Sequence, residues 1–135
     1  MNMKKYLFDR KWVQLLFMAI VLLISSIHVQ AQHLHIYGGD NHDVYLGCLT
    51  SSPYDSKSIW NEYGTYGNEY SSYSPWNEYA SNPPVIVDKE GKFYGYFTVN
   101  KYKSQRADFK LVLLIYEYRE LIKENLQKWY DKLFE

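Results

Sequence analysis

An internal repeat in the middle of the chain constrains its fold more than any other feature. Residues 54–63 read YDSKSIWNEY and residues 70–79 read YSSYSPWNEY, so seven of ten positions are identical at an offset of 16. The identical pairs are Tyr54/Tyr70, Ser56/Ser72, Ser58/Ser74, Trp60/Trp76, Asn61/Asn77, Glu62/Glu78 and Tyr63/Tyr79. Serine and asparagine side chains bond to nearby backbone groups and favour turns. We expect ordered loop-like units over 54–69 and 70–85 that lean on the rest of the domain, with one short helical turn around Ser58–Tyr63.

Strand patterns flank the repeats. Residues 33–37 alternate and predict a short strand, and residues 43–49 predict a second strand with Val44, Leu46 and Cys48 on one side. Two prolines at 83–84 end the second copy, and a hairpin is predicted over residues 85–100 with its turn at 88–91. In the return strand, Phe93, Gly95, Phe97 and Val99 are expected to share one face.

The last part of the chain has helical periodicity. Apolar residues step by three or four along one face from residue 106 to 134: Leu111, Ile115, Tyr118, Ile122, Leu126, Trp129 and Leu133. The run LVLLI at 111–115 fits either a buried first turn or a strand before a shorter helix, and the unbroken periodicity favours one helix over 106–134. The predicted fold class is α+β: a small, mostly antiparallel sheet, an aromatic Ser/Asn-rich repeat insertion, and a C-terminal amphipathic helix on the sheet.

The first 31 residues have the three parts of a secretory signal. A basic start with Lys4, Lys5, Arg10 and Lys11 precedes an apolar stretch and the V-x-A sequence that ends at Ala31. An uncleaved membrane anchor is the alternative, but the apolar stretch of about 15 residues is shorter than the roughly 20 that span a bilayer. We therefore expect residues 1–31 to be removed as a signal peptide, leaving a single exported domain at 32–135.

Composition excludes some classes of function for residues 32–135. The signal segment carries four of the 15 basic residues and one of the 15 acids, which leaves 11 against 14 and a net charge of −3. A nucleic-acid-binding surface needs a clustered basic face, so no nucleic-acid partner is expected. The many tyrosines argue against disorder. Because Cys48 is the only cysteine, no intramolecular disulfide can form, and a buried role in a strand is favoured for it.

The order of these motifs resembles a family. A strand ending L-G-C-L, tandem Y-x-S-x-S-I-x-N-x-Y-G units, a final S-P-x-N unit before Pro-Pro, and a hairpin closing on G-Y-F-T-V-N are similar to a group of small bacterial exported or envelope-associated proteins. The resemblance covers roughly residues 43–100. It implies the same domain boundaries and supplies no catalytic residues.

The repeat aromatics are the leading candidates for ligand binding. Flat rings interleaved with hydrogen-bonding groups suit glycans and many protein partners. The candidate residues are Trp60, Asn61, Tyr63, Trp76, Asn77 and Tyr79. The alternative is that these rings form the core of a loop-rich region, and burial of both tryptophans would remove the main support for glycan binding.

Metal and catalytic sites are weaker candidates. His33, His35 and His42, near Asp40 and Asp43, could hold zinc or copper. Asp55, Ser56, Asn61 and Glu62 offer oxygen ligands for calcium, although Ser71 replaces the aspartate in the second copy. Glu62 and Glu78 could act as the acid of a small hydrolase, although one structural role performed twice explains their repetition better.

The sequence as a whole favours an exported, non-enzymatic module with a binding or structural role at the cell envelope, in the periplasm or outside the cell. The expected partner is an envelope glycan or protein, no cofactor is expected, and contact with the membrane is expected only through the signal peptide before cleavage. The alternative is the small hydrolase.

Overall fold

A computed structural model of the chain describes residues 11–23 and 33–135. Residues 11–23 form a helix whose residues are all exposed. Among the described residues, no helix combines the length and apolar character that a bilayer crossing requires. The expected cleavage position after Ala31 lies outside the described residues.

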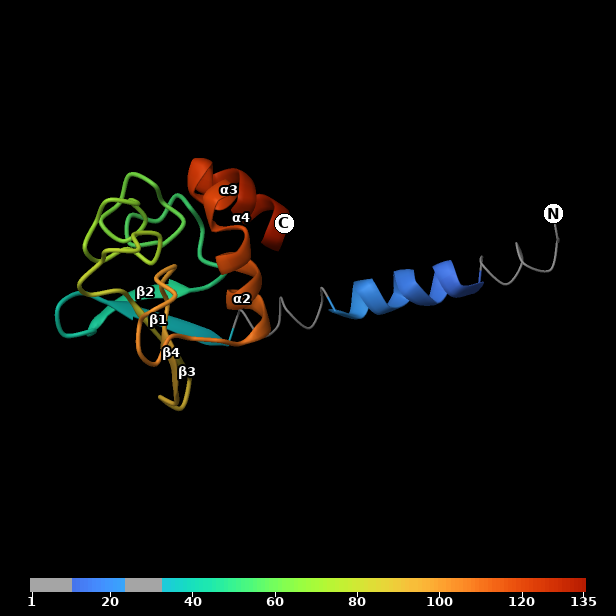
Figure 1. Ribbon diagram of the computed structural model, residues 1–135, viewed down its shortest axis with the longest axis horizontal. Coiled ribbons are helices and arrows are strands. Elements are labelled where there is room, and N and C mark those ends of the chain that lie inside the picture. The colour runs from blue at the N-terminus through green and yellow to red at the C-terminus, as the bar shows by residue number, and fades with distance from the viewer. Residues whose placement is uncertain (1–10, 24–32) are drawn as a thin grey trace.

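The predicted sheet is present and its strands are antiparallel. It consists of β1 (Leu34–Gly38), β2 (Val44–Cys48), β3 (Val85–Asp88) and β4 (Phe93–Tyr96), in the spatial order β2-β1-β3-β4. β1 lies in the middle, and it pairs with β2 on one side and with β3 on the other. Together with the C-terminal helices, this sheet confirms the α+β fold class (Figure 1).

The hairpin of β3 and β4 is shorter than the sequence predicted. Strand β4 ends at Tyr96, and the chain then turns toward the repeats: the Phe97 amide donates to the Pro84 carbonyl at 2.8 Å, and the Val99 amide donates to the Pro75 carbonyl at 2.9 Å. Phe97 and Val99, which were expected to share a face with Phe93, are buried. Phe93 is 44% exposed, because the strand register shifts between Ile86 and Val87.

The repeats form a series of tight turns, here called the turn array and defined as residues 52–80. From Ser52 onward, each turn is closed by a hydrogen bond from the backbone N–H of its fourth residue to the carbonyl of its first residue. Examples are the Ser58 N–H to the Asp55 carbonyl and the Asn61 N–H to the Ser58 carbonyl. A new turn begins at every third residue, except where one extra residue enters at Gly67. The 16-residue offset is therefore five three-residue turns plus one residue. The expected helical turn around Ser58–Tyr63 is absent, and that prediction was wrong.

Side chains at the first position of each turn explain why the array forms. Ser58 Oγ accepts from the Trp60 amide at 3.1 Å, and Asn61 Oδ1 accepts from the Tyr63 amide at 3.0 Å. The second copy repeats both bonds, Ser74 with Trp76 at 3.1 Å and Asn77 with Tyr79 at 3.0 Å. These side-chain bonds offer the backbone a local alternative to helix or sheet pairing.

The C-terminal segment is divided into three helices, so the prediction of one helix over 106–134 was wrong. The helices are α2 (Lys110–Glu117), α3 (Arg119–Glu124) and α4 (Leu126–Phe134). The last break falls at Asn125, whose extended backbone ends α3 and whose side chain accepts from the Lys128 amide as the N-cap of α4. The break lets the chain change direction. The run at 111–115 is helical, as favoured.

One core joins the sheet, the turn array and the helices. In Figure 1 the array, coloured green to yellow, and helices α3 and α4, coloured red, lie side by side on one side of the sheet. Fully buried side chains come from all three regions and from the chain after β4, among them Ile36, Ile86, Trp60, Trp76, Phe97, Leu111, Ile115 and Ile122. The array is therefore part of the core, with an inner and an outer surface.

Candidate functional site

The two repeated tryptophans lie in the core. Trp60 and Trp76 are each 1% exposed, with ring centroids 5.2 Å apart. The Trp60 indole donates to the Leu49 carbonyl at 2.8 Å, and the Trp76 indole donates to the Ile59 carbonyl at 2.6 Å. Of the two alternatives that the sequence left open, burial holds for the tryptophans, so they cannot offer a ring face to a ligand. The main support that the sequence gave to glycan binding is thereby removed, and a binding role of the repeats would have to use their other residues.

The two repeated asparagines brace the array. The Asn61 amide donates to the Asp55 carbonyl at 3.2 Å while its oxygen caps Tyr63. Asn77 makes the equivalent pair of bonds to Ser71 and Tyr79. The candidate ligand groups of these two residues are therefore used within the array itself.

The repeated tyrosines point outward. Tyr54 is 80% exposed, Tyr63 89%, Tyr70 83% and Tyr79 86%, and these four define the tyrosine surface. Each occupies an equivalent position in the two copies. The outer surface of the array is thus aromatic as well as the inner one, and the predicted ligand residues Tyr63 and Tyr79 belong to it.

A cleft of about 260 Å³, here called the first-copy cleft, lies at the first repeat. Its lining residues come from the array and from α4: Pro53, Tyr54, Trp60, Asn61, Glu62, Tyr63 and Gln127. The Gln127 amide donates to the Tyr54 hydroxyl, so that ring is held at the rim although it is exposed. The Glu62 carboxylate bonds to the Tyr63 hydroxyl and raises the pKa of that phenol. The structure therefore brings Trp60, Asn61 and Tyr63 to one cleft, with the tyrosine ring as the exposed member.

The two candidate acids, Glu62 and Glu78, do not line a common cleft. Glu62 lines the first-copy cleft, whereas Glu78 lines a separate pocket together with Arg106 and Arg119. Both carboxylates belong to exposed residues. The arrangement gives no facing pair of carboxylates at these positions.

The candidate metal ligands have other partners. His35 Nδ1 bonds to the Tyr45 hydroxyl at 2.9 Å, and His42 Nε2 bonds to the Pro83 carbonyl at 2.9 Å, while His33 is exposed. Within residues 11–23 and 33–135, no three His, Cys, Asp or Glu side chains lie close enough together to hold a metal ion. His35 and His42 line one groove of the sheet, but the structure does not gather the three histidines into a metal site.

Two of the four candidate calcium ligands, Asp55 and Asn61, are also engaged locally. Asp55 Oδ1 accepts from the Lys57 amide at 2.9 Å and serves as a turn cap. The Asn61 side chain bonds to the Asp55 carbonyl and the Tyr63 amide. These oxygens stabilise the first copy of the array.

A groove on the outer face of the sheet was not predicted. Its volume is about 530 Å³; His35, Tyr37 and Tyr45 supply three rings from the sheet, His42 adds a ring from the loop after β1, and Val85 and Val87 lie beside them. The Tyr37 and Tyr45 rings are 5.3 Å apart, and partial burial raises the pKa of the Tyr45 phenol. Strict alternation in β1, extended across to β2, would have placed these three rings on one face.

The single cysteine is a free thiol of intermediate exposure. Its sulfur lies 3.0 Å from Thr50 Oγ1 and 3.8 Å from Ser51 Oγ. Cys48 is therefore less buried than the favoured interpretation predicted. It has hydroxyl partners in place of a purely apolar environment.

Comparisons with known proteins do not add a relative. No family model, no curated protein and no solved structure matches this chain. The resemblance to small exported bacterial proteins stays a prediction.

Proposed function

We propose that this chain is an exported, non-enzymatic module that binds glycans at the cell envelope through its tyrosine surface. The observation that carries the proposal is that both copies of the repeat place the same tyrosines in solvent. Export to the periplasm or beyond follows from the signal-like sequence of residues 1–31.

The repeated positions divide into two kinds. Internal contacts explain the Ser58/Ser74, tryptophan and asparagine pairs, because each caps a turn, fills the core or braces the backbone in both copies. A tyrosine ring that is four-fifths exposed or more contributes little burial energy to folding. Keeping such rings in both copies supports a role at the surface.

The chemistry of the first-copy cleft suits a sugar. A tyrosine ring offers a flat apolar face to the C–H groups of a pyranose, and its hydroxyl can exchange hydrogen bonds with sugar hydroxyls. Tyr54 and Tyr63 supply two rings, and Glu62 and Gln127 supply polar groups at the same cleft. Its volume of about 260 Å³ is near the lower end of small-molecule sites, about 300 Å³, so it fits a single sugar unit of a longer chain.

The alternative, a small hydrolase with Glu62 or Glu78 as its acid, has less support. Glycoside hydrolysis commonly needs two carboxylates that flank one scissile bond, at most about 10 Å apart. Glu62 and Glu78 line different pockets, and Glu117, which shares the pocket of Glu78, is exposed as Glu78 is. A binding surface needs no such pair.

The test is calorimetric titration of the purified protein with peptidoglycan fragments and neutral polysaccharides. Saturable binding is expected, and replacing both Tyr54 and Tyr63 by alanine should weaken it about tenfold or more, as for ring contacts at the centre of an interface. Tyr118→Ala is the control, because Tyr118 is a partly exposed ring outside the array. Replacing Tyr70 and Tyr79 instead shows whether the second copy contributes.

Two results would overturn the proposal. One is the absence of binding to every glycan tested while the protein is folded. The other is binding that is unchanged in both double variants.

A further inference from the structure

A second pocket lies where the end of the second repeat copy meets the loop after β4 and the junction of α2 and α3. Its volume is about 330 Å³. Charged and aromatic side chains line it: Glu78, Lys101, Tyr102, Arg106, Tyr116, Glu117 and Arg119. It shares no lining residue with the first-copy cleft. We call it the Arg106 pocket.

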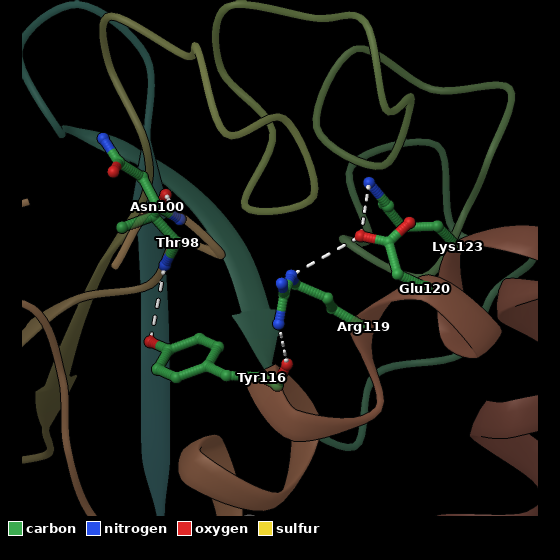
Figure 2. A network of polar contacts seen from close by, with 6 residues as sticks. All are labelled: Thr98, Asn100, Tyr116, Arg119, Glu120 and Lys123. Carbon is green, nitrogen blue, oxygen red and sulfur yellow. Dashed lines mark hydrogen bonds and ion pairs between the residues drawn. The ribbon is translucent and has the colours of Figure 1, made fainter. Parts of the chain in front are cut away.

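The guanidinium of Arg106 is held in a fixed orientation. Its Nε donates to the Thr98 carbonyl at 2.8 Å, and its central carbon lies 3.6 Å from the centroid of the Tyr116 ring. Tyr116 is 4% exposed, and its hydroxyl accepts from the Thr98 amide at 3.4 Å (Figure 2). A planar cation stacked on a fixed ring is pre-organised for bidentate contact with an anion.

This guanidinium has no carboxylate partner among residues 11–23 and 33–135. The ion pairs described there join Glu120 to Arg119 at 3.5 Å and to Lys123 at 3.6 Å. Glu78 and Glu117 line the same pocket without pairing with Arg106. Partial burial of this unpaired cation lowers the pKa of Arg106. An anion from outside would therefore find the group already oriented.

Two further cations line the pocket. Arg119 is held by its own bond to the Tyr116 carbonyl at 3.1 Å and by Glu120, and Figure 2 shows this chain of contacts continuing to Lys123. Lys101 is exposed, and its ammonium lies 5.1 Å from the centre of the Tyr102 ring. The lining thus carries three positive and two negative side chains.

We propose that the Arg106 pocket binds the acidic group of a saccharide, a carboxylate or a phosphate. Arg106 forms the bidentate contact with the anion, and Lys101 adds a second positive charge. The Tyr102 ring, 83% exposed, offers a face to the sugar. The carboxylates of Glu78 and Glu117 accept hydrogen bonds from sugar hydroxyls, which distinguishes an acidic saccharide from a bare anion.

This proposal goes beyond the proposed function and does not depend on the tyrosine surface. Neutral glycan binding and acidic saccharide binding use different residues. Either one can therefore fail in experiment while the other holds.

The test is calorimetric titration of the purified protein with three probes: tetragalacturonate for the carboxylate, glucose 1-phosphate for the phosphate, and neutral maltotetraose as the reference. We expect at least one acidic probe to bind about tenfold more tightly than the neutral one. The tighter of the two acidic probes identifies the anion.

Three variants assign the binding to this pocket. Arg106→Lys keeps the charge and loses the planar fork, so acidic binding should fall about tenfold, with thermal unfolding as the check on folding. Lys101→Gln changes an exposed side chain and should weaken binding about threefold through the loss of one charge. Lys128→Gln, an exposed lysine on α4 outside the pocket, should change nothing.

The proposal is overturned if neither acidic probe binds, or if the acidic and neutral probes bind equally to the Tyr54 and Tyr63 double variant, in which the rings of the first-copy cleft are removed. It is also overturned if acidic binding is the same in the Arg106 and Lys101 variants as in the unchanged protein. Since Lys101 is exposed, its variant keeps the test decisive even if Arg106→Lys fails to fold.

Discussion

The first and second copies of the repeat place the same tryptophan in two different surroundings. Trp60 packs against α4, with its ring centroid 5.8 Å from those of Tyr130 and Phe134. Trp76 packs edge-on against Phe97, again at 5.8 Å, and Phe97 in turn contacts Tyr116 of α2. Both rings are equally buried. Local sequence thus supplies the turn and the ring, whereas the neighbour that covers the ring comes from a distant part of the chain.

The outer surfaces of the two copies also differ. In the first copy, Tyr54 is tied to Gln127 and lines the first-copy cleft. In the second copy, the Tyr73 hydroxyl donates to Asp40 at 2.8 Å, which ties the array to the loop after β1. The two copies therefore have the same turns but different contacts with the rest of the domain. Variants in each copy can separate the shared effects from the different ones.

The largest effect is expected from removing either buried tryptophan. Trp60→Ala and Trp76→Ala should each lower the free energy of unfolding by about 3–5 kcal/mol, because each leaves a cavity in the shared core. Urea unfolding measures this. Tyr63→Ala and Tyr79→Ala are the controls and should change stability by less than about 0.5 kcal/mol. If only one tryptophan variant is costly, the two copies do not share one core.

A smaller effect on the free energy of unfolding is expected at high pH from Tyr116, which packs on the side of the second copy. Burial raises the pKa of Tyr116 to about 12 from its ordinary value of 10. The neutral phenol is favoured in the folded state, so its contribution is complete below pH 10 and is lost as the pH rises through 12. The free energy of unfolding should fall by about 1.4 kcal/mol per pH unit in that window.

Tyr116→Phe should remove this part of the pH dependence. Urea unfolding of both proteins at pH 9, 10 and 11 gives the comparison. Other tyrosines also titrate in this range, so the difference between the two proteins is the quantity to measure. Identical slopes would mean that Tyr116 does not supply the effect.

The next effect concerns the extra residue between the copies. A Cβ at Gly67 would lie 1.9 Å from the Asn61 carbonyl oxygen, a contact that the backbone must move to relieve. Gly67→Ala should therefore cost about 1–3 kcal/mol in unfolding free energy. Thr65→Ala, at an exposed position of the same connector, is the matched control. An unchanged stability for Gly67→Ala would show that the two copies are not held in this register.

The smallest effect should distinguish the two capping serines. Ser58→Ala and Ser74→Ala each remove one turn cap and should cost about 1 kcal/mol. Ser58 Oγ also donates to the Ser51 carbonyl at 3.3 Å, so its loss should cost slightly more. Thermal unfolding of the two variants, side by side, checks the order. A larger cost at Ser74 would contradict the idea that the first copy has the extra attachment.

Much of the fold was predictable because its signals are local. The strands, the hairpin turn at Asp88–Gly91 and the helical character of 111–115 follow from side-chain periodicity. The division of the C-terminal helix did not follow, because Asn125 lies inside an unbroken apolar pattern and acts as an N-cap only where the chain changes direction. The three-residue spacing of Ser58 and Asn61, and of their equivalents Ser74 and Asn77, already carried the period of the array. The repeat offset of 16 is not a multiple of three, so comparing the two copies did not reveal that period.

The candidate site was predictable only in part. The repeat identified the aromatic residues, but it did not indicate that the tryptophans are buried and the tyrosines exposed. The Arg106 pocket joins residues from the array, the loop after β4 and α2, and no spacing along the chain indicates that Arg106 stacks on Tyr116.

The sequence by itself determined most of the turn array, because the turn bonds and their serine and asparagine caps join residues two to four positions apart, and the bracing bonds of Asn61 and Asn77 reach back only six. The tertiary structure decided which rings are core and which are surface. Trp60 and Trp76 are buried because α4 and the chain after β4 cover them, whereas Tyr63 and Tyr79, on the same turns, stay exposed. Burial depends on contacts between distant segments, and those contacts exist only once the whole domain has folded.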